Sequence, residues 1–171
     1  MASASVQGYD EVLKGQFAVY RKISEQIGGD VKEQSDLVKQ ALDAERAFLV
    51  TAAGRAKPSQ DELTKMLEET SKKMNAVEEF RNKNRASKQF NHLSSVSEGI
   101  GALGWVVAPM KPDAFVKEKI NAAEFYTNRV LKDFKDQDAK HADWVKAFLG
   151  ALKELEAYTK KHHSAALTWG K

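Results

Sequence analysis

Two groups of side chains in this sequence carry reactive or ionic chemistry: four histidines and one short basic stretch. The histidines are His92, His141 and the adjacent pair His162 and His163. A di-iron helical bundle requires Glu-x-x-His on two helices together with further inward-facing glutamates. The nearest approach to that pattern is Asp138-x-x-His141, and Asp138 is better explained as the N-cap of a helix. The sequence therefore predicts no metal site.

The histidine pair near the end of the chain does not form a site either. Adjacent residues on a helix point about 100° apart, so His162 and His163 do not easily share a ligand. We interpret both as solvated side chains at a helix C-terminus, where cations are favoured. The sequence has no cysteine, no Gly-rich phosphate loop, and no HExxH or GxSxG motif. We expect a protein that is not an enzyme and binds no cofactor.

The basic stretch is RNKNRASK, residues 81–88, which holds four cationic side chains and no acidic one. Arg81, Arg85 and Lys88 are separated by four and three residues, so they would share one face of a continuous helix, with Lys83 on the other. A cluster of this kind is a candidate binding surface for an acidic partner.

The apolar stripe of the helix before this stretch ends at Phe80. The next positions on the same stripe are polar: Asn84, Ser87 and Asn91. We therefore expect the helix to break between residues 82 and 87, which places the cations at a corner of the fold. Glu78 and Glu79 lie three to four residues before Arg81 and Lys83, and we expect them to pair in part with those cations.

Three interpretations of this corner remain open: a solvated turn, a contact with a protein, and a contact with nucleic acid. Nucleic-acid binding would require a longer basic stripe or interleaved aromatic residues. The whole chain has 27 basic and 24 acidic residues, a formal charge of only +3, so we expect no nucleic-acid partner.

Apolar residues recur at helical spacing along the whole chain, and the helices that they predict would position these groups. This spacing predicts helices at approximately 9–27, 31–53, 60–82, 88–107, 114–135 and 139–163. No strand-like alternation occurs, and the links are short. We predict an all-α fold, an antiparallel six-helix bundle, with residues 1–171 forming a single helical domain.

Small and aromatic residues predict where these helices pack. The segment 88–107 is rich in serine and glycine, which indicates that a neighbouring helix approaches it closely. Trp144 and Tyr158 are expected in the core, and Trp169 is expected to fold back onto the bundle. Phe125 lies off the apolar stripe of its helix, so we expect it or its neighbour Tyr126 to face another helix or a partner.

The start of the chain, MASASVQGYDEV, lacks the basic and apolar regions of a signal peptide, and no window has the length of a membrane span. These features favour a cytoplasmic location.

Several blocks in the right order resemble one known family. These are FRNKNRASKQFNHLSSVSEGIGALGWV (80–106), AAEFYTNRVLKDFKD (122–136), HADWVKAF (141–148) and HHSAALTWGK (162–171). They are similar to the N-terminal helical folded domain of cyclase-associated protein, and the resemblance extends more loosely to DAERAFL (43–49) and KPSQ (57–60).

This resemblance implies a non-catalytic module of actin turnover, cytoplasmic and associated with the cytoskeleton. In that family the helical domain tends to form a side-by-side homodimer. It works with cofilin, binds the pointed end of cofilin-decorated actin filaments and speeds the loss of terminal subunits. The resemblance also implies that the chain is a fragment of a larger multidomain protein. The family's oligomerisation helix, proline-rich, WH2 and β-sheet regions are missing from it, so we assign neither cyclase binding nor nucleotide exchange to these residues.

Two functions from different classes follow as expectations. The first is an actin-filament disassembly module, for which the candidate contacts are Arg81, Arg85, Lys88 and Asn91. The second is a non-catalytic dimerisation or scaffold domain that links signalling and actin-binding regions.

Overall fold

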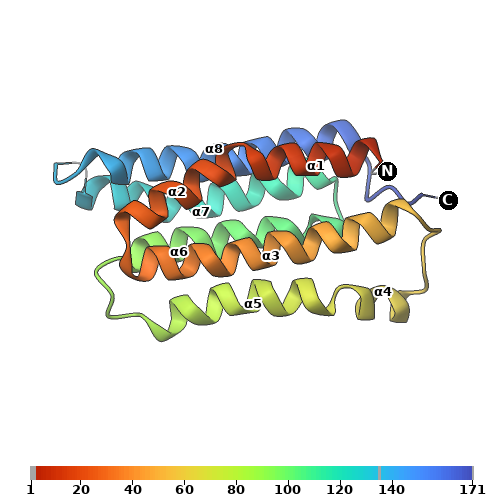
Figure 1. The fold of residues 1–171 in the computed structure, drawn as a ribbon, viewed down its shortest axis with the longest axis horizontal. Coiled ribbons are helices and arrows are strands. Elements are labelled where there is room, and N and C mark those ends of the chain that lie inside the picture. Colours follow the sequence, from red (N-terminus) through yellow and green to blue (C-terminus); the bar gives the residue numbers. More distant parts are fainter. Residues whose placement is uncertain (1–2, 135, 171) are drawn as a thin grey trace.

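The structure, a computed structural model, describes residues 3–134 and 136–170, and every regular element in this part of the chain is helical. The helices are α1 Ala4–Lys14, α2 Gln16–Ile27, α3 Gly29–Ala53, α4 Gln60–Met66, α5 Glu68–Lys83, α6 Phe90–Gly99, the 3-10 helix η1 Ile100–Val107, α7 Pro112–Phe134 and α8 Ala139–His162. They run nearly parallel to the long axis of the molecule, and the chain reverses direction after α2, α3, α5, η1 and α7 (Figure 1). The predicted all-α antiparallel bundle is confirmed.

Helices α8, α7 and α3 each pack against several neighbours in the bundle. Helix α8 packs against α7, α2 and α1, and α7 also packs against α6 and η1. Helix α3 lies between α2 and α5, and α5 forms the outer edge (Figure 1). The α2–α3, α5–α6 and α7–α8 turns therefore all lie at one end of the bundle.

The first predicted helix, 9–27, begins earlier, at Ala4, and is interrupted at Gly15. The interruption is stabilised by α8, because the Glu154 carboxylate accepts a hydrogen bond of 2.7 Å from the amide of Gln16. A side chain at Gly15 would place its Cβ 2.5 Å from Glu154 Oε1, so glycine leaves the space that this carboxylate occupies.

The third predicted helix, 60–82, is divided at Leu67 into α4 and α5. Its predicted start is correct: Ser59 Oγ accepts a hydrogen bond of 3.2 Å from the amide of Glu62. The Glu62 side chain does not complete the reciprocal capping box. It pairs with Arg55 at 2.7 Å, at the start of the preceding loop.

The serine- and glycine-rich segment predicted as one helix, 88–107, begins at Phe90 and changes to the tighter η1 after Gly99. A Cβ at Gly99 would lie 2.6 Å from the ring of Phe148 and 3.0 Å from Leu152 of α8. The predicted close approach of a neighbouring helix is confirmed at this position.

The fifth helix begins two residues earlier than predicted, at Pro112 rather than 114, because proline suits the first turn of a helix, where its missing N–H is not needed. Its predicted end at residue 135 lies outside the described residues. The sixth begins at Ala139, after Asp138, whose carboxylate accepts a hydrogen bond of 3.0 Å from the amide of Lys140. The N-cap assignment for Asp138 is therefore confirmed.

The aromatic predictions for the core are also confirmed. Trp144 and Tyr158 are buried, and the Trp144 indole donates a hydrogen bond of 2.9 Å to Ser24 Oγ on α2. Trp169 folds back onto the bundle, with its ring centroid 6.0 Å from that of Phe48 on α3.

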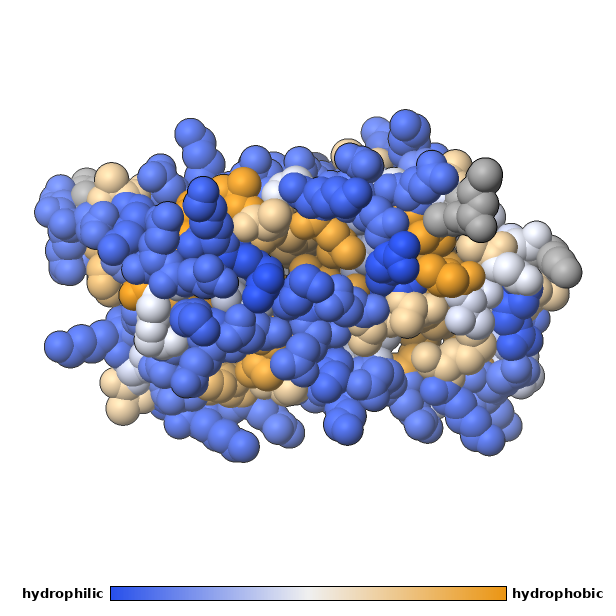
Figure 2. Space-filling view, in the orientation of Figure 1, coloured by the Kyte–Doolittle hydropathy of each residue, from blue (hydrophilic) through white to orange (hydrophobic). Residues whose placement is uncertain are grey.

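Hydrophilic side chains cover most of the face in Figure 2, and apolar side chains show between them in separate patches. None of the helices within 3–134 and 136–170 combines the length and the apolar character that a bilayer crossing requires.

One carboxyl group lies inside the core. Glu45 of α3 is fully buried, and among the described residues neither of its oxygens has a hydrogen-bond partner. Burial raises the pKa of Glu45 well above the usual value for a carboxyl group. The Trp105 indole opposes this rise, although the two groups do not reach hydrogen-bond geometry. Burial therefore favours the neutral form of this carboxyl group over the ionised form.

The burial of Glu45 predicts that the free energy of unfolding decreases as the pH rises. The folded-state pKa of Glu45 lies above the unfolded value of about 4.3, so stability is fully present below that value and is lost as the pH rises toward the folded-state pKa. Glu45→Gln cannot ionise and escapes this loss. The free energy of unfolding, measured by urea titration from pH 4 to 9, should favour E45Q increasingly as the pH rises. A difference between E45Q and the parent protein that does not change with pH would contradict this account.

Candidate protein-interaction surface

The α5–α6 turn is built by side chains that cap the backbone. Helix α5 ends at Lys83, and the Asn84 side-chain amide donates a hydrogen bond of 2.6 Å to the carbonyl of Phe80. The amide of Ser87 donates to the Asn84 carbonyl at 3.0 Å, and Ser87 Oγ accepts from the amide of Gln89 at 3.0 Å. The predicted helix break is thus a defined turn.

Gln89 fixes this turn to a second element. Its Oε1 accepts a hydrogen bond of 3.0 Å from the amide of Val31, in the first turn of α3. The N-cap residue of α3, Gly28, has no side chain to satisfy such an amide, so Gln89 supplies the missing acceptor from the turn. This hydrogen bond connects the turn to the start of α3.

Arg81 is a structural residue more than a free surface cation. Its Nε donates a hydrogen bond of 3.0 Å to Ser94 Oγ on α6, and its Nη1 donates to Asn82 at 3.0 Å. The guanidinium also lies 4.7 Å from the centre of the Phe90 ring. These contacts join the end of α5 to the start of α6.

Asn91, the fourth predicted site residue, is similarly engaged. Its side-chain amide donates a hydrogen bond of 3.2 Å to the carboxylate of Asp133 on α7. The structure thus brings Asn91 close to the other predicted residues but uses it to connect α6 with α7.

Three cations of the stretch remain exposed: Lys83, Arg85 and Lys88. Within the described chain, none of them forms an ion pair or a side-chain hydrogen bond. The expected pairing of Glu78 and Glu79 with Arg81 and Lys83 is likewise not formed among these residues. We define Lys83, Arg85 and Lys88 as the basic corner.

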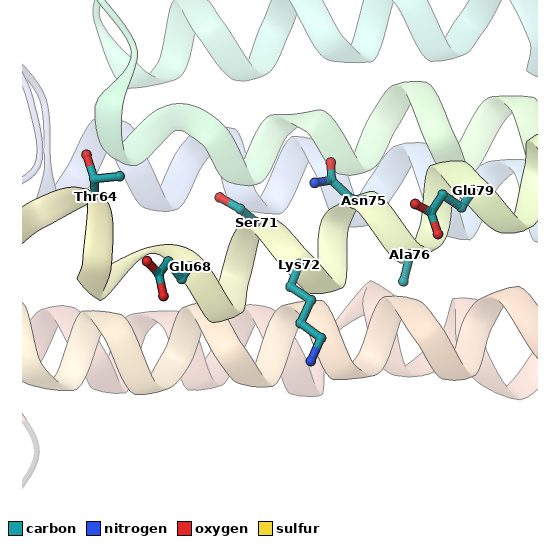
Figure 3. Close-up of a pocket in the computed structure, with 7 residues that line it drawn as sticks. All are labelled: Thr64, Glu68, Ser71, Lys72, Asn75, Ala76 and Glu79. Atoms are coloured by element: carbon teal, nitrogen blue, oxygen red, sulfur yellow. The ribbon is translucent and has the colours of Figure 1, made fainter.

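An open groove runs along the outer face of α5 and leads toward the corner. It is lined by Thr64, Glu68, Ser71, Lys72, Asn75, Ala76 and Glu79 (Figure 3). All of these side chains come from α4 and α5, and all except Ala76 are exposed. Small-molecule sites are usually concave and bury most of their ligand, so this open groove is better suited to contact with a protein surface.

Two histidines that the sequence separates by many residues form a buried pair. His92 Nε2 and His141 Nδ1 are 2.9 Å apart, and the His141 ring stacks on Phe134. Burial, and secondarily the charge of His141, lowers the pKa of His92 to about 3. Burial also lowers the pKa of His141, so both rings are neutral at pH 7, and they share one hydrogen bond that connects α6 to α8.

The interpretation of His163 as a solvated residue is wrong. It is buried, its Nδ1 accepts a hydrogen bond of 3.0 Å from the amide of Thr168, and its Nε2 lies 3.1 Å from the Tyr158 hydroxyl. Burial, with a smaller contribution from His162, lowers the pKa of His163 to about 4. The tail after α8 folds back over the bundle and covers this ring, which a helical pattern does not reveal.

In the part of the chain that the structure describes, no group of three or more His, Cys, Asp or Glu side chains has the geometry to hold a metal ion.

Comparison with known proteins agrees with this fold. A family model described as "CAP, N-terminal domain" matches residues 9–167. The chain is 51% identical to adenylyl cyclase-associated protein 1 of Homo sapiens over 170 residues, which is 99% of this chain and 36% of that protein. It is 44% identical to adenylyl cyclase-associated protein 2 of Homo sapiens over 167 residues, 98% of this chain and 35% of that protein. The chain thus spans little more than one third of the length of these relatives.

Two solved structures have the same architecture. A crystal structure of the N-terminal domain of CAP, described as indicating variable oligomerisation, matches with a TM-score of 0.93 and 38% identity, covering 98% of this chain and 91% of that one. The N-terminal domain of the adenylyl cyclase-associated protein from Dictyostelium discoideum matches with a TM-score of 0.91 and 37% identity, covering 96% of this chain and 93% of that one.

The different environments of the arginines predict different effects of substitution. Arg81→Ala removes the hydrogen bond to Ser94 and the contact with Phe90, and should lower the free energy of unfolding by about 1 to 2 kcal/mol. Arg85→Ala, at an exposed position without such contacts, should change it by less than about 0.5 kcal/mol. Urea unfolding of both variants tests this assignment. Equal effects of the two substitutions would show that Arg81 is not structural.

Proposed function

The chain belongs to the family of CAP N-terminal domains, and on that premise we propose that it is an actin-turnover module. It binds the pointed end of cofilin-decorated actin filaments and promotes dissociation of the terminal subunits. It acts in the cytoplasm, on the cytoskeleton, and by binding rather than by catalysis.

The observation that carries this proposal is the basic corner. Lys83, Arg85 and Lys88 are exposed and unpaired within the described chain, and they project from a turn that is anchored to α3 and α6. Charges held on a fixed support attract an acidic partner over roughly 10 Å at moderate salt, the distance over which ions screen such forces. Actin is acidic as a whole, so it has the charge that this corner favours.

Promotion of dissociation requires more than attraction. A ligand shifts an equilibrium only if it binds one state better than another. Cofilin changes the arrangement of neighbouring actin subunits, and a bundle with fixed surfaces can match the changed arrangement better than the relaxed one. Binding energy gained only in that arrangement lowers the free energy of the state from which a subunit leaves.

A second candidate function is a non-catalytic dimerisation or scaffold domain. It is favoured by the solved N-terminal domain of CAP that is described as indicating variable oligomerisation. In this alternative the domain would self-associate and hold signalling and actin-binding regions together, with no direct effect on filaments. A mass in sedimentation that stays monomeric over a wide range of protein concentration would count against it.

Substitution of the basic corner tests the first function. Lys83→Ala/Arg85→Ala/Lys88→Ala should slow the depolymerisation of cofilin-decorated pointed ends by about tenfold at low salt, because steering by charge changes association rates by at least that factor. The measurement is the shortening of single filaments with and without the domain. Arg81 is left unchanged, since its loss would also disturb the fold.

The chain offers a control with the same change in net charge. Lys153, Lys160 and Lys161 are exposed on α8, toward the opposite end of the bundle. Their replacement by alanine should leave the rate unchanged. Equal losses in the two triple variants would mean that net charge, and not the basic corner, is responsible. If the unsubstituted domain does not accelerate subunit loss, the proposed function is wrong.

A further inference from the structure

The outward face of α7 carries a second group of side chains, of which Phe125 and Arg129 are exposed and Tyr126 is half-buried. Phe125 and Tyr126 pack edge to face, with ring centroids 5.1 Å apart and an interplanar angle of 86°. The Arg129 guanidinium lies over both rings, 4.4 Å from the centre of Phe125 and 5.7 Å from that of Tyr126. We define these three residues as the aromatic–arginine surface.

The phase of α7 explains why this surface faces outward. The core side of the helix consists of Val116, Ile120, Ala123, Thr127 and Val130, which are all buried. Phe125 lies off that stripe and is 57% exposed, the highest value among the large apolar side chains of the described chain. The sequence-based expectation was that Phe125 or Tyr126 faces another helix or a partner, and the exposed ring of Phe125 leaves the contact with a partner as a prediction. No other helix of the described chain covers its ring.

Arg129 is free to accept an acidic group. Asp133 lies one turn further along α7, at the spacing at which the two side chains could pair, but its carboxylate accepts a hydrogen bond from Asn91 of α6. Among the described residues Arg129 has no ion pair. The exposed Arg129 guanidinium lies beside both rings, and arginine N–H groups can bind a carboxylate in a forked geometry.

We propose that the aromatic–arginine surface is a second contact of this domain with the cofilin-decorated actin filament. Phe125 packs against an apolar side chain of an actin subunit, and Arg129 binds a carboxylate beside it. This inference rests on the proposed function, and it adds a short-range contact to the long-range attraction of the basic corner.

The two surfaces have different physical properties. Long, mobile lysine and arginine side chains steer an encounter but tolerate many geometries. Stacked aromatic and arginine side chains are already ordered, so binding costs little side-chain entropy and depends strongly on position. Tyrosine and arginine are also the types most enriched where single residues dominate binding energy. A contact of this kind supplies the geometric selectivity that preferential binding to cofilin-altered filaments requires.

The test measures the affinity of single-site variants for pointed ends of cofilin-decorated actin filaments over a series of salt concentrations. Phe125→Ala should weaken binding by about tenfold, the size expected for a residue that dominates a contact, and by a similar factor at every salt concentration. Arg129→Lys keeps the charge but loses the flat, forked group, and should weaken binding by roughly threefold or more. The basic-corner variant should instead show a loss that shrinks as salt rises.

Controls on the same helix separate this contact from general effects. Asn128→Ala and Lys132→Ala alter exposed neighbours on α7 and should bind as the unsubstituted domain does. Helical circular dichroism and the midpoint of urea unfolding should be unchanged in all variants, because every substituted side chain is at the surface.

Each other outcome overturns the inference in a distinguishable way. If the unsubstituted domain does not bind filaments, the proposed function fails and this inference fails with it. If the domain binds and F125A and R129K bind equally well, only the inference fails. If F125A lowers the sedimentation mass of the domain but leaves filament binding intact, the surface is an interface between two copies of the chain.

Discussion

The structure depends on the packing of the aromatic side of α8 against α2 and α6. Trp144 and Phe148 lie with nearly parallel rings 5.9 Å apart, and Tyr20 of α2 contacts both. Phe148 also fills the space at Gly99 that a larger residue would take. The Trp144 indole donates to Ser24 Oγ, which in turn donates to the Tyr20 carbonyl, so these hydrogen bonds join α8 to α2 within the aromatic cluster. Packing of this kind resists local change, because a shift in one helix would open a cavity beside another.

That rigidity gives the two surface groups a constant relative position. The basic corner is tied to α3 through Gln89 and to α6 through Arg81, and the aromatic–arginine surface belongs to α7, which packs on α6. Asn91 links these regions directly, since its bond to Asp133 also leaves Arg129 without an acidic partner. The proposed selection of one arrangement of actin subunits would need contacts whose spacing does not adapt, and a rigid bundle has such a spacing.

The sequence predicted those features that follow from local pattern. The apolar stripe ending at Phe80 predicted the break before α6, and the small residues around Gly99 predicted the close approach of a neighbouring helix, which the structure identifies as α8. Contacts between distant segments left no such pattern. The Gly15 interruption depends on Glu154, and the burial of His163 depends on a tail that folds back. The structural role of Arg81 was missed for the same reason, because Ser94 and Phe90 come within its reach only after the turn has formed.

The central claim is that this rigid domain prefers the actin arrangement that cofilin produces. The most direct measurement is the dwell time of the fluorescently labelled domain at single pointed ends, compared between bare and cofilin-decorated filaments at the same salt concentration. We expect dwell times at least about tenfold longer on decorated ends, since a smaller preference would shift the equilibrium by less than about 1.4 kcal/mol. Equal dwell times on the two kinds of filament would contradict the account.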